Sequence, residues 1–382
     1  MKPIRNRAQS WHTTLGAPIL ALVLAAVTAC GSAAPSSAPA QTTAGSAKPA
    51  ASSAQTSAAT EVPATLDALY AAAKKEGALQ TSLSWQDDQW LPLAKAFSDR
   101  YPGIKLDRLE ISPDKGLERI ITEKAAGKVS TDLAGARLSE MTQVISRDLA
   151  ATYDYRKVFG LSNDVVQDDN RYVIAYQNGS ILSYNTKLLD DASAPKDWKD
   201  LLDPRFQGGK VIVAQDANDV FWALAKEWGR DTMLDFARKL AAQKPRFSRS
   251  ASDTTSLLIA GDAPVALSLY AGSIMKYTAK GAPIKGTAAS PVSVDNNGVW
   301  VLKDAAHPNA ARLFAGWLAT PEAQNVFDTT NNRSLLIPGT STKTAQYVQS
   351  LGVKLIMEQP TDIETDAKTQ ADAMAIIRGK NG

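Results

Sequence analysis

Polar and aromatic side chains follow the predicted strands at the points where those strands end. In open α/β sheets, small solutes bind beyond the carboxyl ends of strands and at the amino ends of helices, where backbone N–H groups are free. Hydrogen-bonding groups and aromatic faces at these points could hold a small solute without covalent chemistry. The candidate ligand contacts are Ser84, Trp85, Gln86, Arg137, Tyr176, Asp216, Asn218, Tyr270, Ser273, Asn296 and Asn297.

Each candidate also has an ordinary structural role. Trp85 is either a lid over a small solute or a surface aromatic. The planar guanidinium of Arg137 would suit a carboxylate or a phosphonate, although an arginine in a loop is often simply solvated. Asp216 can cap the helix that follows it, and Asn296 and Asn297 can serve turn geometry. The residue types therefore favour binding of a polar solute and leave its identity open.

Motifs typical of catalysis or of metal binding are absent from the sequence. It contains neither Gly-x-Ser-x-Gly nor His-Glu-x-x-His, which hydrolases and metalloproteases use. His307 is the one histidine beyond the amino-terminal region, and its His-Pro-Asn context is typical of a helix start. We therefore expect no enzyme activity, no cofactor and no resident metal. An exported hydrolase is the main rival, because the 39 acidic residues allow many carboxylate pairs.

The elements that must position these side chains alternate between strands and helices. Apolar residues recur at helical spacing in some segments and alternate in others. This order is typical of an α/β architecture with largely parallel sheets. Predicted strands cover 78–82, 104–109, 131–136, 172–176, 181–185, 210–214, 264–269 and 298–302, and predicted helices cover 66–76, 88–100, 114–127, 198–204, 219–229, 232–243, 254–260, 273–280, 309–319 and 321–328.

The amino terminus, residues 1–29, has the pattern of a signal peptide. Its basic residues precede an apolar run of 15 residues, from 15 to 29, which is shorter than the roughly 20 needed to span a bilayer as a helix. Small residues then lead into Cys30, the single cysteine of the chain. This context resembles the lipobox of bacterial lipoproteins. The resemblance implies cleavage before Cys30, acylation of its thiol by palmitate-like chains, and a lipid anchor on the extracytoplasmic side of a membrane. The rival is a plain secretory signal with an incidental cysteine.

Residues 30–60 read as a spacer between that anchor and a folded body. They are almost entirely Ser, Ala, Thr, Pro, Gly and Gln, a composition that favours a disordered tether with a reach of roughly 30 Å. Loss of the signal peptide would remove three of the 42 basic residues and leave 39 to balance 39 acidic ones. That neutral balance disfavours nucleic acid as a partner.

Several short motifs lie in order between about 65 and 330. They are Ala73-Lys74-Lys75-Glu76-Gly77, Tyr101-Pro102-Gly103-Ile104-Lys105, Ser183-Tyr184-Asn185-Thr186-Lys187, the run from Pro195 to Gly208, the run from Asn297 to Lys303, and His307-Pro308-Asn309 continuing to Pro321-Glu322-Ala323-Gln324. Their order and spacing, rather than any single motif, resemble the type 2 periplasmic-binding-protein family of ABC importers, in the group that includes ferric-iron and aminoalkylphosphonate receptors.

The resemblance implies two α/β lobes, each with a mixed, mostly parallel sheet flanked by helices and joined by hinge strands. The first lobe would comprise 61–182 and 286–382, and the second 183–285, with crossings near 181–184 and 291–299. The implied function is that of an extracytoplasmic, lipid-anchored solute receptor. It would act as a monomer that traps one solute or ion between its lobes and delivers it to a permease and its ATPase.

A small anionic organic molecule is the expected solute. Iron-binding members of the family usually have two adjacent tyrosines after the strand that ends here at Leu269, whereas this chain has Leu269-Tyr270-Ala271-Gly272. Tyr270 is still the strongest candidate contact, because the family commonly uses a tyrosine near this point. A ferric-iron receptor is the alternative, since phenolate and carboxylate oxygens could still bind iron. A sensory or scaffolding lipoprotein with the same fold is a further rival.

Overall fold

The computed structural model of the protein describes residues 62–215 and 220–379. The predictions for the signal peptide, for Cys30 and its spacer, and for Asp216 and Asn218 lie outside these residues. Strands and helices alternate along the described chain, which confirms the predicted α/β class. None of the helices in the two described ranges is long and apolar enough to cross a membrane.

Most predicted elements are present, and several more appear. The helices of the described ranges are α1 (Leu66–Glu76), α2 (Asp87–Arg100), α3 (Pro113–Ala125), α4 (Leu138–Ser146), α5 (Tyr155–Phe159), α6 (Val220–Trp228), α7 (Arg230–Ala242), α8 (Ala251–Ala260), α9 (Ala271–Thr278), α10 (Pro308–Leu318), α11 (Pro321–Asn331), α12 (Lys343–Ser350) and α13 (Ile363–Ile377), with short 3-10 helices at Trp198–Leu202, Pro204–Phe206 and Pro360–Asp362. The strands are β1 (Ala78–Leu83), β2 (Lys105–Glu110), β3 (Leu133–Arg137), β4 (Val166–Gln167), β5 (Tyr172–Asn185), β6 (Val211–Ala214), β7 (Arg246–Ser248), β8 (Val265–Tyr270), β9 (Ile284–Gly286), β10 (Val292–Val301) and β11 (Leu355–Met357).

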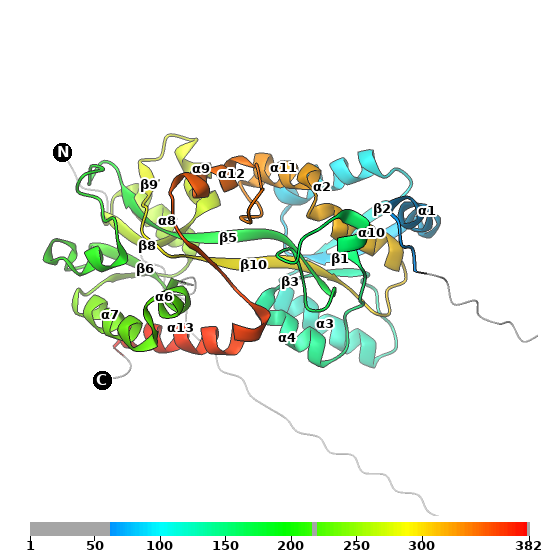
Figure 1. Cartoon of the computed structure of the whole chain (residues 1–382), viewed down its shortest axis with the longest axis horizontal. Helices are drawn as coiled ribbons and strands as arrows, with labels where there is room; N and C mark the ends of the chain where they lie inside the picture. The colour runs from blue at the N-terminus through cyan, green and yellow to red at the C-terminus, as the bar shows by residue number, and fades with distance from the viewer. Residues whose placement is uncertain (1–61, 216–219, 380–382) are drawn as a thin grey trace, which may run out of the picture. The chain divides into compact units, whose positions relative to one another are not determined.

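The strands form one mixed sheet whose main path runs β2-β1-β3-β10-β5-β8-β6-β7. The pairs toward either end of this path, such as β1 with β2 and β6 with β7, are parallel. In the middle, β10 is antiparallel to both β3 and β5, and β5 is antiparallel to β8. Figure 1 shows β5 in green and β10 in yellow running side by side through the centre of the sheet. The two parallel portions are therefore joined through two long antiparallel strands.

Two strand predictions were wrong in extent. The sequence predicted separate strands at 172–176 and 181–185, but β5 runs unbroken from Tyr172 to Asn185. Likewise, β10 starts at Val292 rather than at 298. The polar residues between the predicted strands interrupt the apolar pattern, yet their backbones stay in the ladder because Asn178 and Ser180 pair with Asp295 and Ser293.

The buried apolar side chains of β5 and β10 belong to different clusters toward the two ends of each strand. On β5, Tyr176 belongs to a first cluster with α1, α2 and α10, whereas Ile181 belongs to another with β8 and α9. On β10, Val299 lies in the first cluster and Val294 in the other. We call the residues between these limits, 177–180 and 295–298, the polar interval. It falls close to the predicted hinge crossings, although the exact lobe boundaries stay a prediction.

The carboxyl-terminal helix α13 packs mainly with α6 and α7, while its first residue, Ile363, belongs to the first cluster. We placed 286–382 in the first lobe, but α13 contributes Ala373, Met374 and Ile377 to the cluster that contains residues of α6 and α7. Ion pairs support this packing, because Lys226 of α6 lies 2.8 Å from a carboxylate oxygen of Asp366. Figure 1 shows α13, in red, alongside α6 and α7. Helical periodicity reveals an apolar face but not which cluster that face will meet.

Local signals explain why helices begin directly after several strands. Thr65 caps α1 by accepting a hydrogen bond from the Ala68 backbone N–H at 3.3 Å, and Gly77 ends that helix with φ 72°. Gln86 is the N-cap of α2, three residues after β1 ends, and Tyr270 is both the last residue of β8 and the N-cap of α9. These strand-to-helix junctions place helix amino termini at the carboxyl ends of strands in both parallel portions of the sheet.

Candidate functional site

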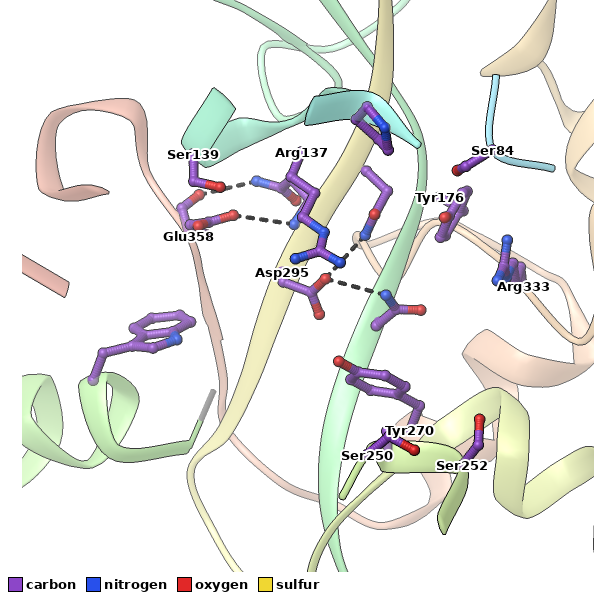
Figure 2. Close-up of a pocket in the computed structure, with 16 residues that line it drawn as sticks. Ser84, Arg137, Ser139, Tyr176, Ser250, Ser252, Tyr270, Asp295, Arg333 and Glu358 are labelled. Carbon is purple, nitrogen blue, oxygen red and sulfur yellow. Dashed lines mark hydrogen bonds between the residues drawn. The ribbon is translucent and has the colours of Figure 1, made fainter. Parts of the chain in front are cut away.

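A cavity of about 430 Å³ lies beside the polar interval. Residues from both strands of that interval face it, including Asn178 of β5 and Asp295 of β10. Figure 2 shows the side chains that line it, brought together from segments that are far apart in the sequence. Six of the predicted contacts line this cavity, namely Ser84, Arg137, Tyr176, Tyr270, Asn296 and Asn297.

A second cavity of about 270 Å³ adjoins the first. It is lined by two more of the predicted contacts, Gln86 and Ser273, and again by Tyr270. The two cavities share Asn178, Ser252, Tyr270 and Arg333 in their linings. Tyr270 and Arg333 therefore lie where the two spaces meet.

Trp85 lies elsewhere. Its side chain is only 4% exposed, and its ring packs edge-on against Phe327 with centroids 5.2 Å apart. It is not among the residues that line either cavity in the described chain. The predicted role of a lid over the solute therefore has no support in its position. Its contact with the wall is indirect, through Phe327.

Strand-to-helix junctions deliver several of the lining side chains. Ser84 follows β1, and Arg137 is both the last residue of β3 and the N-cap of α4. The Arg137 backbone N–H donates to Glu140 Oε2 at 2.9 Å, which fixes the start of that helix. Tyr270 ends β8 in the same way before α9. The side chains of Ser84, Arg137 and Tyr270 at these junctions line the larger cavity.

Asp295 carries a negative charge into the middle of the polar interval. Its Oδ2 accepts hydrogen bonds from Asn178 Nδ2 at 3.1 Å and from Asn297 Nδ2 at 2.9 Å. Burial raises the pKa of the Asp295 carboxyl, while these two amides and the nearby positive charge of Arg137 partly oppose that rise. Figure 2 shows the guanidinium of Arg137 directed toward Asp295. Asn297 is thus used to hold this carboxylate as well as to line the cavity.

Asn296 is mainly committed to holding the carboxyl-terminal segment in place. It is 1% exposed, and its Oδ1 accepts a hydrogen bond from Gln177 Nε2 at 2.8 Å. Its Nδ2 donates to the Glu358 carbonyl oxygen at 3.0 Å, and its backbone N–H donates to Glu358 Oε2 at 3.3 Å. These bonds bring Glu358 to the cavity wall. A structural role accounts for the buried amide of Asn296.

Arg333 is held over an aromatic ring at the junction of the two cavities. Its guanidinium carbon lies 4.5 Å from the centroid of the Tyr176 ring, a geometry typical of a cation–π contact. The Tyr176 ring in turn packs on Phe327, at 5.8 Å between centroids. The Arg333 backbone N–H donates to the Phe327 carbonyl oxygen at 3.5 Å. Strand β5 and helix α11 together therefore position this arginine.

Sequence reasoning did not find Asn178, Asp295, Arg333 or Glu358, all of which line the larger cavity. The polar runs that interrupt the apolar pattern of the crossing strands were a usable signal for Asn178 and Asp295. Arg333 follows the end of α11, and Glu358 follows a three-residue strand. Arg333 does not match the strand-end rule, whereas Glu358 follows a short strand that the sequence pattern did not predict. Their approach to the cavity depends on tertiary packing.

The lining offers charged and polar groups suited to binding. Two guanidiniums and two carboxyls are present in the larger cavity, together with tyrosine and serine hydroxyls. Within the described chain, no group of three or more His, Cys, Asp or Glu side chains is arranged to hold a metal ion. The arrangement can therefore bind a small polar molecule through charge-assisted hydrogen bonds and aromatic contact.

Comparison with known sequences places most of the folded chain in one group. A family model described as bacterial extracellular solute-binding protein matches residues 92–349. An uncharacterized protein of Haemophilus influenzae is 29% identical over 140 residues, which is 35% of this chain and 39% of that protein. The chain thus spans about two fifths of the length of that curated relative.

Solved structures share the fold over nearly their full length. Iron-bound HitA from Pseudomonas aeruginosa superposes with a TM-score of 0.63 at 17% identity, covering 78% of this chain and 99% of that one. A structure described as the Atu4243-GABA receptor gives a TM-score of 0.63 at 14% identity, over 78% of this chain and 97% of that one. A substrate-binding protein of an ABC transporter from Agrobacterium tumefaciens gives 0.60 at 12% identity, over 79% and 97%. These likenesses confirm the two-lobed periplasmic-binding-protein fold.

Proposed function

Because the chain belongs to the bacterial extracellular solute-binding protein family, it is a solute-binding protein of the ABC-importer type, and we propose that its solute is a small anionic organic molecule. The cavity beside the polar interval supports this proposal, since it is lined by Arg137 and Arg333 among hydroxyl and amide groups. A volume of about 430 Å³ falls in the range of pockets that enclose small organic ligands.

A hinge-like closure of the protein about β5 and β10 would explain how the solute is trapped. The cavity draws Ser84 and Arg137 from the portion of the sheet with β1 and β3, and Tyr270 and Ser252 from the portion with β8. A solute that touches both sets gains its full affinity only when they approach each other, which favours the closed state. A permease and its ATPase would then recognise that closed state and accept the solute from this monomeric receptor.

A thermal-shift screen tests the solute class. Panels of carboxylates, phosphonates, sugars, polyamines and ferric salts would be added to the purified protein, because a ligand of the native state raises the melting temperature. We expect carboxylates or phosphonates to give the largest shifts. A shift produced only by sugars or polyamines would contradict the proposal of an anionic solute.

Ferric iron is the second candidate. Tyr176 and Tyr270 both line the larger cavity, as do Asp295 and Glu358, and phenolate and carboxylate oxygens are ligands for iron. Iron-bound HitA also shares the fold. Binding of iron through tyrosine would give a visible charge-transfer absorption on addition of ferric citrate. Appearance of that band, and its loss in Tyr270→Phe, would favour iron over an organic anion.

We also propose that the protein binds its solute without transforming it. The family and the solved relatives are binding proteins, and the groups that line the cavity of this chain suit hydrogen bonding. Saturable binding of a carboxylate or phosphonate with full recovery of the unchanged compound supports this proposal. Release of a product during prolonged incubation would instead favour the hydrolase alternative.

Cys30 is proposed as the lipid anchor of the mature receptor. Membership of an extracellular family supports an extracytoplasmic location, and the lipobox-like sequence before Cys30 supports the anchor. Labelling with palmitate and fractionation of membranes test this directly. We expect the parent to carry label and to sediment with membranes, and Cys30→Ser to lose both properties. Membrane association of the Cys30→Ser protein would exclude a lipid anchor at this residue.

A further inference from the structure

We propose that Arg333 is the anchor for an oxyanion group of the solute, a carboxylate or a phosphoryl group, at the junction of the two cavities. This assignment rests on the proposed receptor function and gives it a specific binding residue. It differs from the expectation drawn from the sequence, in which Arg137 was the arginine placed to bind such a group.

The first reason is that the Arg333 guanidinium is held by an aromatic ring but has no carboxylate of the described chain to neutralise its charge. Its side chain contacts the Tyr176 ring at 4.5 Å. Within the described chain it forms no ion pair and no side-chain hydrogen bond. A guanidinium has five N–H donors, and stacking on a ring face uses none of them. Arg333 therefore presents its donors to whatever occupies the cavities that it lines.

Arg137 differs from Arg333 in its surroundings. The positive charge of Arg137 acts on Asp295, where it lowers the pKa that burial raises, and it also acts on Glu140 in the first turn of α4. Part of its charge is thus already used by carboxyl groups of the protein. An incoming oxyanion at Arg137 would approach Asp295 as well, and like charges repel. Of the two arginines that line the larger cavity, Arg333 is therefore the better placed to attract an oxyanion.

The second reason is the rigid support behind Arg333. Tyr176, Phe327 and the buried Trp85 form a continuous series of aromatic contacts, with centroid distances of 5.8 and 5.2 Å. Asn332 ends α11 in the left-handed conformation, with φ 51°, and turns the chain toward the cavity. Restricting the guanidinium before binding lowers the entropy that the complex must lose. Trp85 thus contributes to the site from behind its wall.

The test compares the parent with Arg333→Gln and with Arg238→Gln, which removes an exposed arginine of α7. Sodium sulfate and sodium phosphate serve as oxyanion probes against sodium chloride at matched ionic strength, with binding followed by calorimetry and thermal shift. Sulfate raises melting temperatures of any protein through exclusion from its surface, so the difference between variants isolates binding. We expect Arg333→Gln to weaken phosphate and sulfate binding about tenfold or more. Arg238→Gln should match the parent.

Arg333→Lys tests whether the shape of the guanidinium matters in addition to its positive charge. Lysine keeps the positive charge but lacks the planar fork that binds an oxyanion with two parallel bonds. We expect its affinity to fall between those of the parent and Arg333→Gln. Equal sulfate and phosphate affinity in the parent and Arg333→Gln, or no binding of either ion by the parent, would overturn the assignment.

The same variants with 4-aminobutyrate, citrate and 2-aminoethylphosphonate separate the anchor from the receptor function. If the parent and Arg238→Gln bind one of these organic anions and Arg333→Gln binds it more weakly, both the anchor and the receptor function are supported. If the affinity for the organic anion is the same in the parent and in Arg333→Gln, the anchor assignment is overturned and the receptor function is still supported. Oxyanion binding that depends on Arg333, without binding of any of the three organic compounds, supports the anchor and counts against the organic solute.

Discussion

The carbonyl oxygen of Asn332 lies against Gly272, so close that a Cβ atom at position 272 would be 2.1 Å from it. This contact joins the first turn of α9 to the end of α11, directly before Arg333. We expect Gly272→Ala to lower the free energy of unfolding by about 1–3 kcal/mol, because backbone atoms would have to move. Chemical denaturation would measure the change.

Gly116→Ala is the matched control for that substitution. Gly116 also lies in a helix, α3, and a Cβ there would meet only the Ile111 side chain at an ordinary 3.5 Å. Replacement of a helical glycine by alanine is expected to stabilise by up to about 1 kcal/mol. Equal stability changes in the two variants would show that the approach of Asn332 to Gly272 is not a tight contact in solution.

Tyr270→Ala tests the residue at the meeting point of the two cavities. Its ring is only partly buried and lines both spaces. We expect at least about a tenfold loss of affinity for the best-bound compound of the screen, since an aromatic contact and a hydroxyl are removed together. The melting temperature of the empty protein should change little. Tyr270→Phe separates the ring from the hydroxyl, and unchanged affinity in both variants would remove Tyr270 from the site.

Asp295 gives a pH dependence of stability with a defined sign. Burial, opposed in part by Asn178, Asn297 and Arg137, leaves the pKa of the folded carboxyl above its ordinary value. The folded state therefore holds the proton more tightly, and its contribution to stability is lost as the pH rises through the folded pKa. Asp295→Asn, which stays neutral, should be more stable than the parent at pH 7. The difference should disappear below about pH 4, where the unfolded carboxyl is also protonated.

Melting curves of both proteins between pH 3 and 8 would check this expectation. Asp107→Asn is a control of opposite sign, because hydrogen bonds from Lys105 and Gln80 lower the pKa of that exposed carboxyl. Removal of its charge should weakly destabilise the protein at neutral pH and have no effect in acid. A parent that is more stable than Asp295→Asn at pH 7 would contradict the assigned direction for Asp295.

Asp132 is predicted to matter for folding and not for binding. It is 2% exposed and accepts hydrogen bonds from the backbone N–H groups of Gln80 at 2.8 Å and His307 at 2.9 Å. Asp132→Ala would leave these buried donors without a partner and should cost roughly 2–4 kcal/mol of unfolding free energy. The exposed Asp99, paired with Lys95 on α2, is the control, and Asp99→Ala should cost under about 1 kcal/mol.

The affinity of the Asp132→Ala and Asp99→Ala variants for the solute is then measured at a temperature where each variant is folded. The affinity for the best compound of the screen should equal that of the parent, because neither aspartate lines either of the two cavities at the candidate site. Weaker binding by Asp132→Ala at a temperature where it is folded would place this carboxylate in the binding mechanism.

The sequence was informative wherever a local signal fixes a side chain. Ser84, Arg137 and Tyr270 reach the cavity because each stands between a strand and a helix, and both elements can be recognised from periodicity and caps. The same argument failed for Trp85, since its burial against Phe327 depends on where α11 packs. The sequence predicts a break between 176 and 181 in β5, because a loss of apolar alternation cannot be told from the end of a strand.

Arg333 could not have been predicted by these rules, and Glu358 was missed because the three-residue strand before it was not predicted. Arg333 owes its place to the left-handed Asn332 and to the Tyr176 ring, and Glu358 owes its place to Asn296 on β10. Such positions are fixed by contacts between distant segments. Sequence patterns locate elements well, and tertiary packing decides which turns reach a site.

The segment after β11 sets a limit on how far the two sides of the cavity can separate. Met357 packs on the cluster that contains Ile181, whereas Ile363 belongs to the cluster that contains Tyr176. Five residues, 358–362, lie between these two points, and the segment reaches roughly 20 Å at full extension. The reach is shorter while Glu358 stays bonded to Asn296. The amplitude of opening is therefore bounded by the length of a peptide strap as well as by the bending of β5 and β10.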